Sequence, residues 1–242
     1  MKSILQRLRQ LIRATSADYA LTEEPTATEG WRDRTIALRQ RAAYEELLRD
    51  LRNGTPRLDL VIAANAIRES GIAGPSIVEI GCGTGYYSEV FSTLAGPVSY
   101  VGIDYSAAMV AGARKDYPRE RFVMADATSL PFRDRSFDIG FSGNSLMHIP
   151  DYTGAIMETA RIARRWCVFH SVPVVDRRPT TRMRKKAYGV DVFEQTFNTG
   201  ELESLFHKAS LRVRNVREGI AYDLSALLGE HSRLVTFTCE KN

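Results

Sequence analysis

Hydrophobic residues near the start of the chain recur at three- and four-residue intervals, the spacing of an amphipathic helix. This spacing predicts three helices, over residues 1–17, 35–51 and 58–69. Asn53-Gly54 is a stop signal for the second helix, because such residues readily end a helix in a left-handed turn. Between the first two helices, residues 18–30 are rich in Thr, Glu, Pro and Gly and predict a linker.

From Ser76 onward, short apolar runs alternate with helical periods. The runs predict seven strands, over residues 76–80, 98–103, 121–125, 137–142, 166–172, 211–217 and 233–239. Helices are expected between them, over residues 84–95, 106–115, 151–164 and 199–209. This alternation predicts an α/β fold with a seven-stranded, mostly parallel sheet, helices on both faces and the N-terminal helices in front. No clear helix joins the last two strands, so a closing antiparallel pair is expected there.

The first helix has an apolar face formed by Ile4, Leu5, Leu8, Leu11 and Ile12, with basic residues around it. It could pack on its own domain or on a partner subunit. It could instead lie on anionic lipid as a peripheral membrane contact, and its pattern also loosely fits an organelle transit peptide. We therefore separate residues 1–30, the helix and its linker, from a main domain over residues 31–242.

Composition narrows these alternatives only in part. The 242 residues are 44% hydrophobic and 26% charged, which is ordinary for a globular protein. No apolar run approaches the roughly 20 residues needed to span a bilayer, and basic residues interrupt any secretory signal. Cys82, Cys167 and Cys239 have no metal-ligand spacing, so we expect reduced thiols, no bound metal and a cytoplasmic location. The net charge of +4 mildly favours anionic partners without indicating nucleic acid.

The segment Ile77-Val78-Glu79-Ile80-Gly81-Cys82-Gly83-Thr84-Gly85 is the strongest candidate for a binding site. An apolar strand runs into a glycine-rich turn and then opens a helix, whose first amide groups lack partners within the helix. Dinucleotide-binding turns follow the spacing G-x-G-x-x-G. Here Gly81, Gly83 and Gly85 alternate with other residues, and Tyr86 stands at the last glycine position. A bulky residue there disfavours a pyrophosphate, and so an NAD-type oxidoreductase.

Three further motifs follow this turn in order. They are Val101-Gly102-Ile103-Asp104-Tyr105-Ser106, then Phe122-Val123-Met124-Ala125-Asp126-Ala127 with Leu130-Pro131-Phe132, then Phe137-Asp138-Ile139 through Met147-His148-Ile149. Together the four motifs resemble class I S-adenosylmethionine (SAM)-dependent methyltransferases of the type 11 methyltransferase domain. The resemblance covers about residues 76–172. It implies a Rossmann-like fold, SAM as the cofactor and S-adenosylhomocysteine as its product.

The resemblance also implies which residues bind the cofactor. The turn residues Gly81, Cys82, Gly83 and Gly85 would pass close to it. Asp104 would accept hydrogen bonds from both ribose hydroxyl groups, the alternative being a cap for the following helix.

Other residues would complete the cofactor site by resemblance. Tyr105 would pack on the adenine, and Asp126 with the Ala127 amide would bind its edge, although Asp126 also suits a turn. Glu79 would meet the methionyl ammonium, directly or through water. Ser142 and Gly143 would line the sulfonium side.

Methyl transfer from SAM needs the protein chiefly to position the acceptor and to remove a proton. His148 follows the fourth strand at the ligand edge of the sheet, where a histidine could take a hydroxyl proton near neutral pH. The alternative is a structural histidine that caps or packs the next helix. His170, with Ser171, is a second candidate that would face the acceptor, the alternative being a polar strand end.

Residues 177–189 hold six basic residues and no acidic one. Arginine suits phosphate and carboxylate groups, so Arg182 and Arg184 are candidates to bind an anionic acceptor, such as a phosphorylated, nucleotide-linked or lipid-linked saccharide. The alternative is a solvated basic loop. By resemblance, Trp31 would cover the cofactor and shape the acceptor pocket, the alternative being core packing.

The sequence thus predicts a methyltransferase that acts on a small-molecule or saccharide acceptor, at oxygen. A catalytically inactive SAM-binding partner or sensor fits the same cofactor motifs. Nucleic-acid substrates are disfavoured, because the fourth strand leads into Ser142-Gly143-Asn144-Ser145 rather than an N-P-P-Y-type stretch, and no RNA-binding platform is visible. The identity of the acceptor, the choice among oxygen, nitrogen and carbon as the methylated atom, and the oligomeric state are left open.

Overall fold

The computed structural model describes residues 18–23 and 28–242. The helix expected over residues 1–17, and with it the expected membrane contact, lies outside the described residues. Within the described part of the chain, no helix combines the length and apolar character that crossing a membrane requires.

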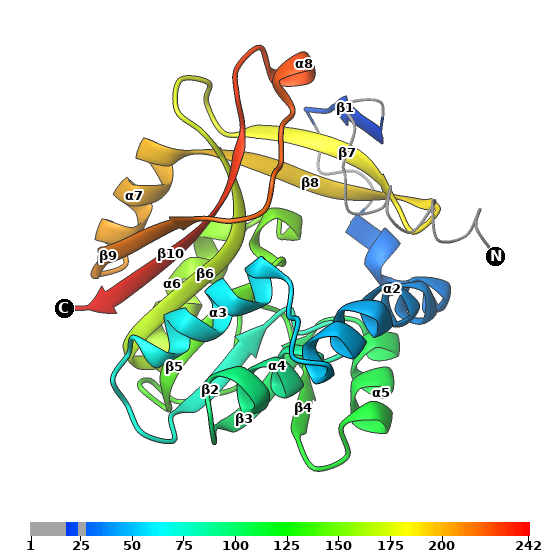
Figure 1. Cartoon of the computed structure of the whole chain (residues 1–242). Coiled ribbons are helices and arrows are strands. Elements are labelled where there is room, and N and C mark those ends of the chain that lie inside the picture. Colours follow the sequence, from blue (N-terminus) through cyan, green and yellow to red (C-terminus); the bar gives the residue numbers. More distant parts are fainter. Residues whose placement is uncertain (1–17, 24–27) are drawn as a thin grey trace.

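A parallel sheet forms the centre of the molecule (Figure 1). Its parallel strands are β2 (Ser76–Ile80), β3 (Ser99–Asp104), β4 (Arg121–Met124), β5 (Phe137–Gly143) and β6 (Ala163–Val175), in the spatial order β4-β3-β2-β5-β6. β10 (Arg233–Lys241) pairs antiparallel with both β6 and β9 (Leu211–Glu218). All seven strands expected from the sequence are present, and the antiparallel closing pair is confirmed. The chain order reverses between β2 and β5, the place where open α/β sheets bind ligands.

Helices cover both faces of this sheet, because its strands bury apolar residues on both sides. One face packs against α2 (Arg34–Arg52), α3 (Leu58–Arg68), α4 (Tyr87–Leu94) and α5 (Ala107–Asp116). The other packs against α6 (Tyr152–Ile162) and α7 (Thr199–Lys208). This arrangement confirms the expected α/β fold class.

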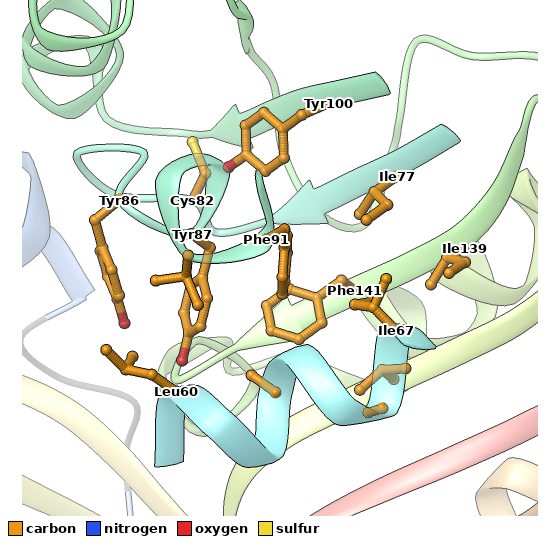
Figure 2. Packing of buried hydrophobic residues seen from close by; sticks show 14 of the residues in the cluster. Leu60, Ile67, Ile77, Cys82, Tyr86, Tyr87, Phe91, Tyr100, Ile139 and Phe141 are labelled. Atoms are coloured by element: carbon orange, nitrogen blue, oxygen red, sulfur yellow. The ribbon is translucent and has the colours of Figure 1, made fainter. Parts of the chain in front are cut away.

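The hydrophobic core between the sheet and α2, α3, α4 and α5, here called the first core, contains the two tyrosines that follow the glycine turn. Figure 2 shows Tyr86 and Tyr87 beside Phe91 and Phe141, between α3 and the strands. Tyr87 is fully buried and Tyr86 nearly so. Both side chains pack in the core, where they hold the start of α4 against the sheet.

Three further strands were not expected from the sequence: β1 (Tyr19–Leu21), β7 (Thr181–Ala187) and β8 (Val190–Asn198). In the part of the chain that the structure describes, the sheet therefore has ten strands rather than seven. β7 and β8 form an antiparallel hairpin that turns at Tyr188-Gly189, where both residues have positive φ, 53° and 82°, as two-residue hairpin turns require. Strands therefore occur in two segments that carried no strand signal: β7 lies within residues 177–189, one interpretation of which was a solvated loop, and β1 lies within residues 18–30, which were expected to form a linker.

The hairpin lies beyond the end of β5. β8 joins the central sheet only where Phe197 and Asn198 pair with Val174 and Val175 at the end of β6. From there the hairpin reaches across to α2 (Figure 1), where the Arg39 guanidinium donates to the Tyr188 carbonyl. β8 also contacts two short 3-10 helices, η2 (Thr28–Arg32) and η3 (Leu146–His148). The hairpin therefore stands at the carboxyl edge of the sheet, where the candidate site lies.

Candidate functional site

A cavity of about 380 Å³ opens at the carboxyl ends of β2, β3, β4 and β5. The strand ends and the loops after them supply most of its lining, and η2, η3, α2 and α5 supply the rest. Its lining residues are Trp31, Arg32, Gln40, Ile80, Gly81, Gly83, Ile103, Asp104, Tyr105, Met109, Ala125, Asp126, Ala127, Thr128, Asn144, Ser145, His148, Ile149, Pro150 and Asp151. The cavity brings together eight of the residues that the sequence analysis singled out: Trp31, Gly81, Gly83, Asp104, Tyr105, Asp126, Ala127 and His148.

The glycine turn forms the floor of this cavity. The amides of Gly81 and Cys82 both donate to the Ile103 carbonyl, each at 2.8 Å, which ties the turn to β3. A Cβ atom at Gly81 would lie 2.4 Å from the Ser145 Cβ atom, and one at Gly83 would lie 2.6 Å from the Gln40 Oε1 atom. Both glycines also have positive φ, so no other residue fits these positions without displacing the cavity wall.

Cys82 and Gly85 support the turn from behind. The Cys82 thiol is buried in the first core near Tyr100 (Figure 2), and burial raises its pKa well above the usual range. A Cβ atom at Gly85 would meet the Phe122 ring at 2.7 Å. Neither residue lines the cavity, so the geometry does not support the predicted contact of Cys82 and Gly85 with a ligand.

Asp104 ends β3 and joins the turn to the cavity. Its Oδ2 atom accepts from the Gly83 amide at 2.8 Å, and its Oδ1 atom accepts from the Ser106 amide at 2.9 Å. Burial raises the pKa of this carboxyl to about 6, against the opposing effect of the amide donors. Ser106, not Asp104, caps α5, since its hydroxyl accepts from the Met109 amide. Asp104 thus keeps its carboxylate at the cavity wall.

Tyr105, Asp126 and Ala127 line one side of the cavity. The Arg32 guanidinium lies 5.2 Å from the centroid of the Tyr105 ring. The Asp126 Oδ1 atom accepts from the Thr128 amide at 2.8 Å and from its hydroxyl at 2.7 Å. Asp126 therefore both forms a turn and faces the cavity, so the two interpretations of its role are compatible.

Glu79 lies outside the lining. Its carboxyl is buried and accepts a hydrogen bond from the Tyr100 phenol. Burial raises the pKa of this carboxyl well above its usual range, although the phenol donor opposes that effect. Its contacts are therefore those of a side chain that supports β2 and β3.

The wall beyond β5 is formed one to two residues later than expected. The Ser142 hydroxyl lies 2.8 Å from the Ser145 hydroxyl, behind the wall, and a Cβ atom at Gly143 would meet Phe141 and Tyr87. Asn144 and Ser145 line the cavity instead. The Ser145 hydroxyl donates to the Ile80 carbonyl at 2.6 Å, which joins this wall to the glycine turn.

His148 lies on η3 with its ring on the cavity wall. Its Nδ1 atom is 2.8 Å from the Phe193 carbonyl oxygen of β8. A carbonyl only accepts, so Nδ1 carries the hydrogen and the neutral ring keeps a lone pair on Nε2. Burial lowers the pKa of this histidine below its ordinary value, against the effects of the Glu194 carboxylate and the Phe193 carbonyl. The ring is therefore neutral near neutral pH.

Trp31 packs beside His148. The two ring centroids are 4.7 Å apart and the planes are tilted by 56°. The indole Nε1 atom is buried and finds no hydrogen-bond partner among the described residues. A buried donor of this kind normally has an acceptor, so Trp31 lines the cavity beside the histidine with an N–H group that is buried and unsatisfied in the described structure.

His170, Arg182 and Arg184 lie outside the cavity lining. His170 is buried, with Nδ1 2.8 Å from the Thr236 hydroxyl and Nε2 3.1 Å from the Ser171 hydroxyl, and burial lowers its pKa to about 4. Arg182 and Arg184 are exposed on β7, where Arg184 pairs with Asp191 at 3.6 Å. The expected contact of these three residues with an acceptor in this cavity finds no support in the geometry.

Several lining residues carried no signal in the sequence. Gln40 is the clearest case, because its Oε1 atom accepts from the Thr84 amide at 3.2 Å and so joins α2 to the glycine turn. Ile149, Pro150 and Asp151 follow η3. Only the packing of α2 and η3 over the sheet edge brings these residues to the cavity. Asn144 also lines the cavity, and its position directly after β5 could have indicated this from the sequence.

The sequence is similar to those of known methyltransferases. Residues 78–169 match the family model described as a methyltransferase domain. The O-methyltransferase cnsE of Penicillium expansum is 30% identical over 161 residues, which are 63% of this chain and 57% of that protein. Demethylmenaquinone methyltransferase of Staphylococcus aureus is 37% identical over 95 residues, 38% of this chain and 39% of that protein. The chain thus matches about half the length of these relatives.

A solved structure shows the same fold over most of the chain. The 1,6-didemethyltoxoflavin-N1-methyltransferase of Burkholderia thailandensis, crystallised with 1,6-didemethyltoxoflavin and S-adenosylhomocysteine, covers 93% of this chain and 95% of its own. Its TM-score is 0.60 and its sequence is 17% identical. At this identity the likeness concerns the fold alone. Together with the family match, it confirms the expected resemblance to class I methyltransferases.

Proposed function

We propose that this chain, which carries the methyltransferase domain in residues 78–169, is a SAM-dependent methyltransferase that transfers a methyl group to oxygen on a small-molecule or saccharide acceptor. The main domain would span residues 31–242. One observation carries the proposal: the cavity floored by the glycine turn and Asp104 also holds a neutral His148, fixed through Nδ1 with the Nε2 lone pair available.

The residues of the cavity fit the polar groups of SAM. Asp104 and Asp126 offer carboxylate oxygens for the ribose hydroxyl groups and the adenine amino group. Gly81 and Gly83 leave the floor free of side chains, and Tyr105 offers a ring face for the adenine. When bound, SAM would supply a methyl group activated by its sulfonium. The Ala127 amide would bind the edge of the adenine. Gln40 would support the site through its hydrogen bond to the glycine turn.

His148 and Trp31 are proposed to handle the acceptor. His148 Nε2 would take the proton of the acceptor hydroxyl as the O–CH₃ bond forms, leaving an imidazolium that later returns the proton to water. Trp31 Nε1, a buried donor in need of an acceptor atom, would bind an oxygen next to the reacting one. The pair would therefore select an acceptor with neighbouring oxygen atoms. The two relatives, an O-methyltransferase and a demethylmenaquinone methyltransferase by name, support a small-molecule acceptor.

We further propose that the acceptor carries an anionic group. Arg182 and Arg184 are exposed on β7, one strand away from β8, whose Phe193 carbonyl orients His148. Anionic groups bound there would lie away from the reacting oxygen. The basic strand therefore suits a long acceptor whose phosphate is distant from its hydroxyl, such as a nucleotide-linked or lipid-linked saccharide.

Calorimetric titration of SAM, S-adenosylhomocysteine and NAD into the protein and into Asp104→Ala tests the cofactor assignment. Micromolar binding of SAM that is lost in the variant supports it, and a preference for NAD overturns it. Transfer of labelled methyl from SAM to a panel of hydroxylated acceptors then separates an enzyme from an inactive SAM-binding partner. Binding without any transfer would favour the partner.

A further inference from the structure

The peptide group between Phe193 and Glu194 connects His148 to a buried carboxylate. Its carbonyl oxygen, from Phe193, lies 2.8 Å from the His148 Nδ1 atom. The other end of the same rigid unit is the Glu194 backbone. Whatever fixes the Glu194 side chain therefore also limits how far this carbonyl can turn.

Glu194 is fixed from three directions. Its Oε1 atom accepts from the Tyr19 phenol at 3.0 Å and from the Tyr222 phenol at 3.1 Å. Its Oε2 atom lies 3.1 Å from the Lys185 ammonium. The carboxylate is only 1% exposed. Its partners come from β1, from β7 and from the segment before α8, so the network joins three separate parts of the chain behind β8.

We propose that Glu194 is a positioning residue for His148, acting through the Phe193 carbonyl and through its own negative charge. This inference rests on the proposed function, because it assumes that His148 takes a proton. The network would hold the carbonyl that selects the Nδ1–H form of the ring. The charge would favour the imidazolium that forms once Nε2 has taken the proton, as an acidic partner does for histidine bases in general.

The charges around His148 have opposite effects. Glu194 raises the pKa of the histidine, whereas burial, the largest effect, and the Lys185 ammonium lower it. Burial also raises the pKa of Glu194 itself, but Lys185, His148 and the Tyr19 phenol outweigh this and leave it below the usual value. Glu194 is therefore ionised at neutral pH, and its negative charge acts on a neutral histidine whose protonation it favours.

Nuclear magnetic resonance can follow this coupling without any acceptor. The chain has four histidines, so each ring signal can be assigned by single substitution, and ring nitrogen shifts report the tautomer. In Glu194→Gln, which keeps an oxygen for the two phenols, we expect the Nδ1–H form to persist and the pKa of His148 to fall by about one unit. In Glu194→Ala we expect a mixture of tautomers.

The control is Glu240→Gln, which removes another paired carboxylate, bound by Arg165 and Arg214 at the far end of β10. It should leave the His148 signals unchanged. If His148 keeps both its pKa and its tautomer in the two Glu194 variants, while the unfolding temperature falls, Glu194 is merely structural and the inference is wrong. If the coupling is found but the protein fails to bind SAM, the proposed function fails and the positioning role fails with it, and only the electrostatic coupling between Glu194 and His148 remains.

Discussion

The Oδ2 atom of Asp104 accepts a hydrogen bond from the Gly83 amide at 2.8 Å. One carboxylate therefore holds the glycine turn in shape and also faces the cavity. Burial raises its pKa to about 6, so its charge changes within the range in which binding is easily measured.

Binding of S-adenosylhomocysteine should weaken as the pH falls through about 6. Hydroxyl donors from a ribose would favour the ionised carboxyl and lower its pKa in the complex. The free protein then holds more protons than the complex below pH 6, so binding releases a proton and strengthens as the pH rises to 6. Calorimetric titration across this range checks the slope. The Asp104→Asn variant should bind S-adenosylhomocysteine weakly, and its affinity should not change near pH 6. The Asp126→Asn variant should keep the pH dependence of the wild type. A wild-type affinity that ignores pH would contradict the assignment.

Trp31→Phe should reduce methyl transfer without reducing stability. The change removes an indole N–H that has no partner among the described residues, and an unsatisfied buried donor costs about 1–3 kcal/mol. We expect an equal or higher unfolding temperature without ligand, together with a higher acceptor KM. Trp166→Phe is the matched control, since Trp166 Nε1 is also buried and unpartnered in the described structure but lies outside the cavity lining. Equal turnover in both variants would exclude Trp31 from acceptor binding.

The strands of the central sheet could be predicted because each side of the sheet buries apolar residues. Ile77 and Val78 face opposite cores, so β2 reads as a continuous apolar run. β7 gave no such signal. It has Met183 and Ala187 as its buried positions and basic residues between them, and Thr181 is its one β-branched residue, so it largely lacks the residues that favour strands.

The site was predictable where a residue ends a strand. Asp104 ends β3 and lies at the cavity as expected, because parallel strands end at one edge of the sheet. Ser142 and Gly143 lie outside the cavity lining because β5 continues to Gly143, and the lining begins at Asn144. The Phe193 carbonyl that orients His148 comes from a distant strand, and no local pattern announces such a contact.

His148→Ala should lower turnover by about 10²-fold or more, the contribution of a general base, while SAM binding stays unchanged. Since burial puts the pKa of His148 below its ordinary value of 6.5, the ring is already deprotonated at neutral pH. Activity should therefore be constant near pH 7 and fall only below the lowered pKa, where the base becomes protonated. Steady-state rates across this range check both points. His207→Ala, at an exposed position on α7, is the control. A loss of less than about fivefold would assign His148 a structural role, because it is far below what a base contributes.

Replacing Arg182 and Arg184 together by Glu should raise the KM for a long anionic acceptor and leave kcat nearly unchanged. Both side chains are exposed and outside the cavity lining, so they can attract a distant phosphate but cannot touch the reacting oxygen. The effect should weaken at high salt, since exposed charges are screened within about 10 Å at 0.1 M ionic strength. Lys208→Glu with Arg212→Glu makes the same charge change at exposed positions on α7 and β9 and should leave KM unaltered. If both double variants behave like the wild type, the acceptor is not held by charge at β7. His148 and Trp31 would then be left as the residues that select it.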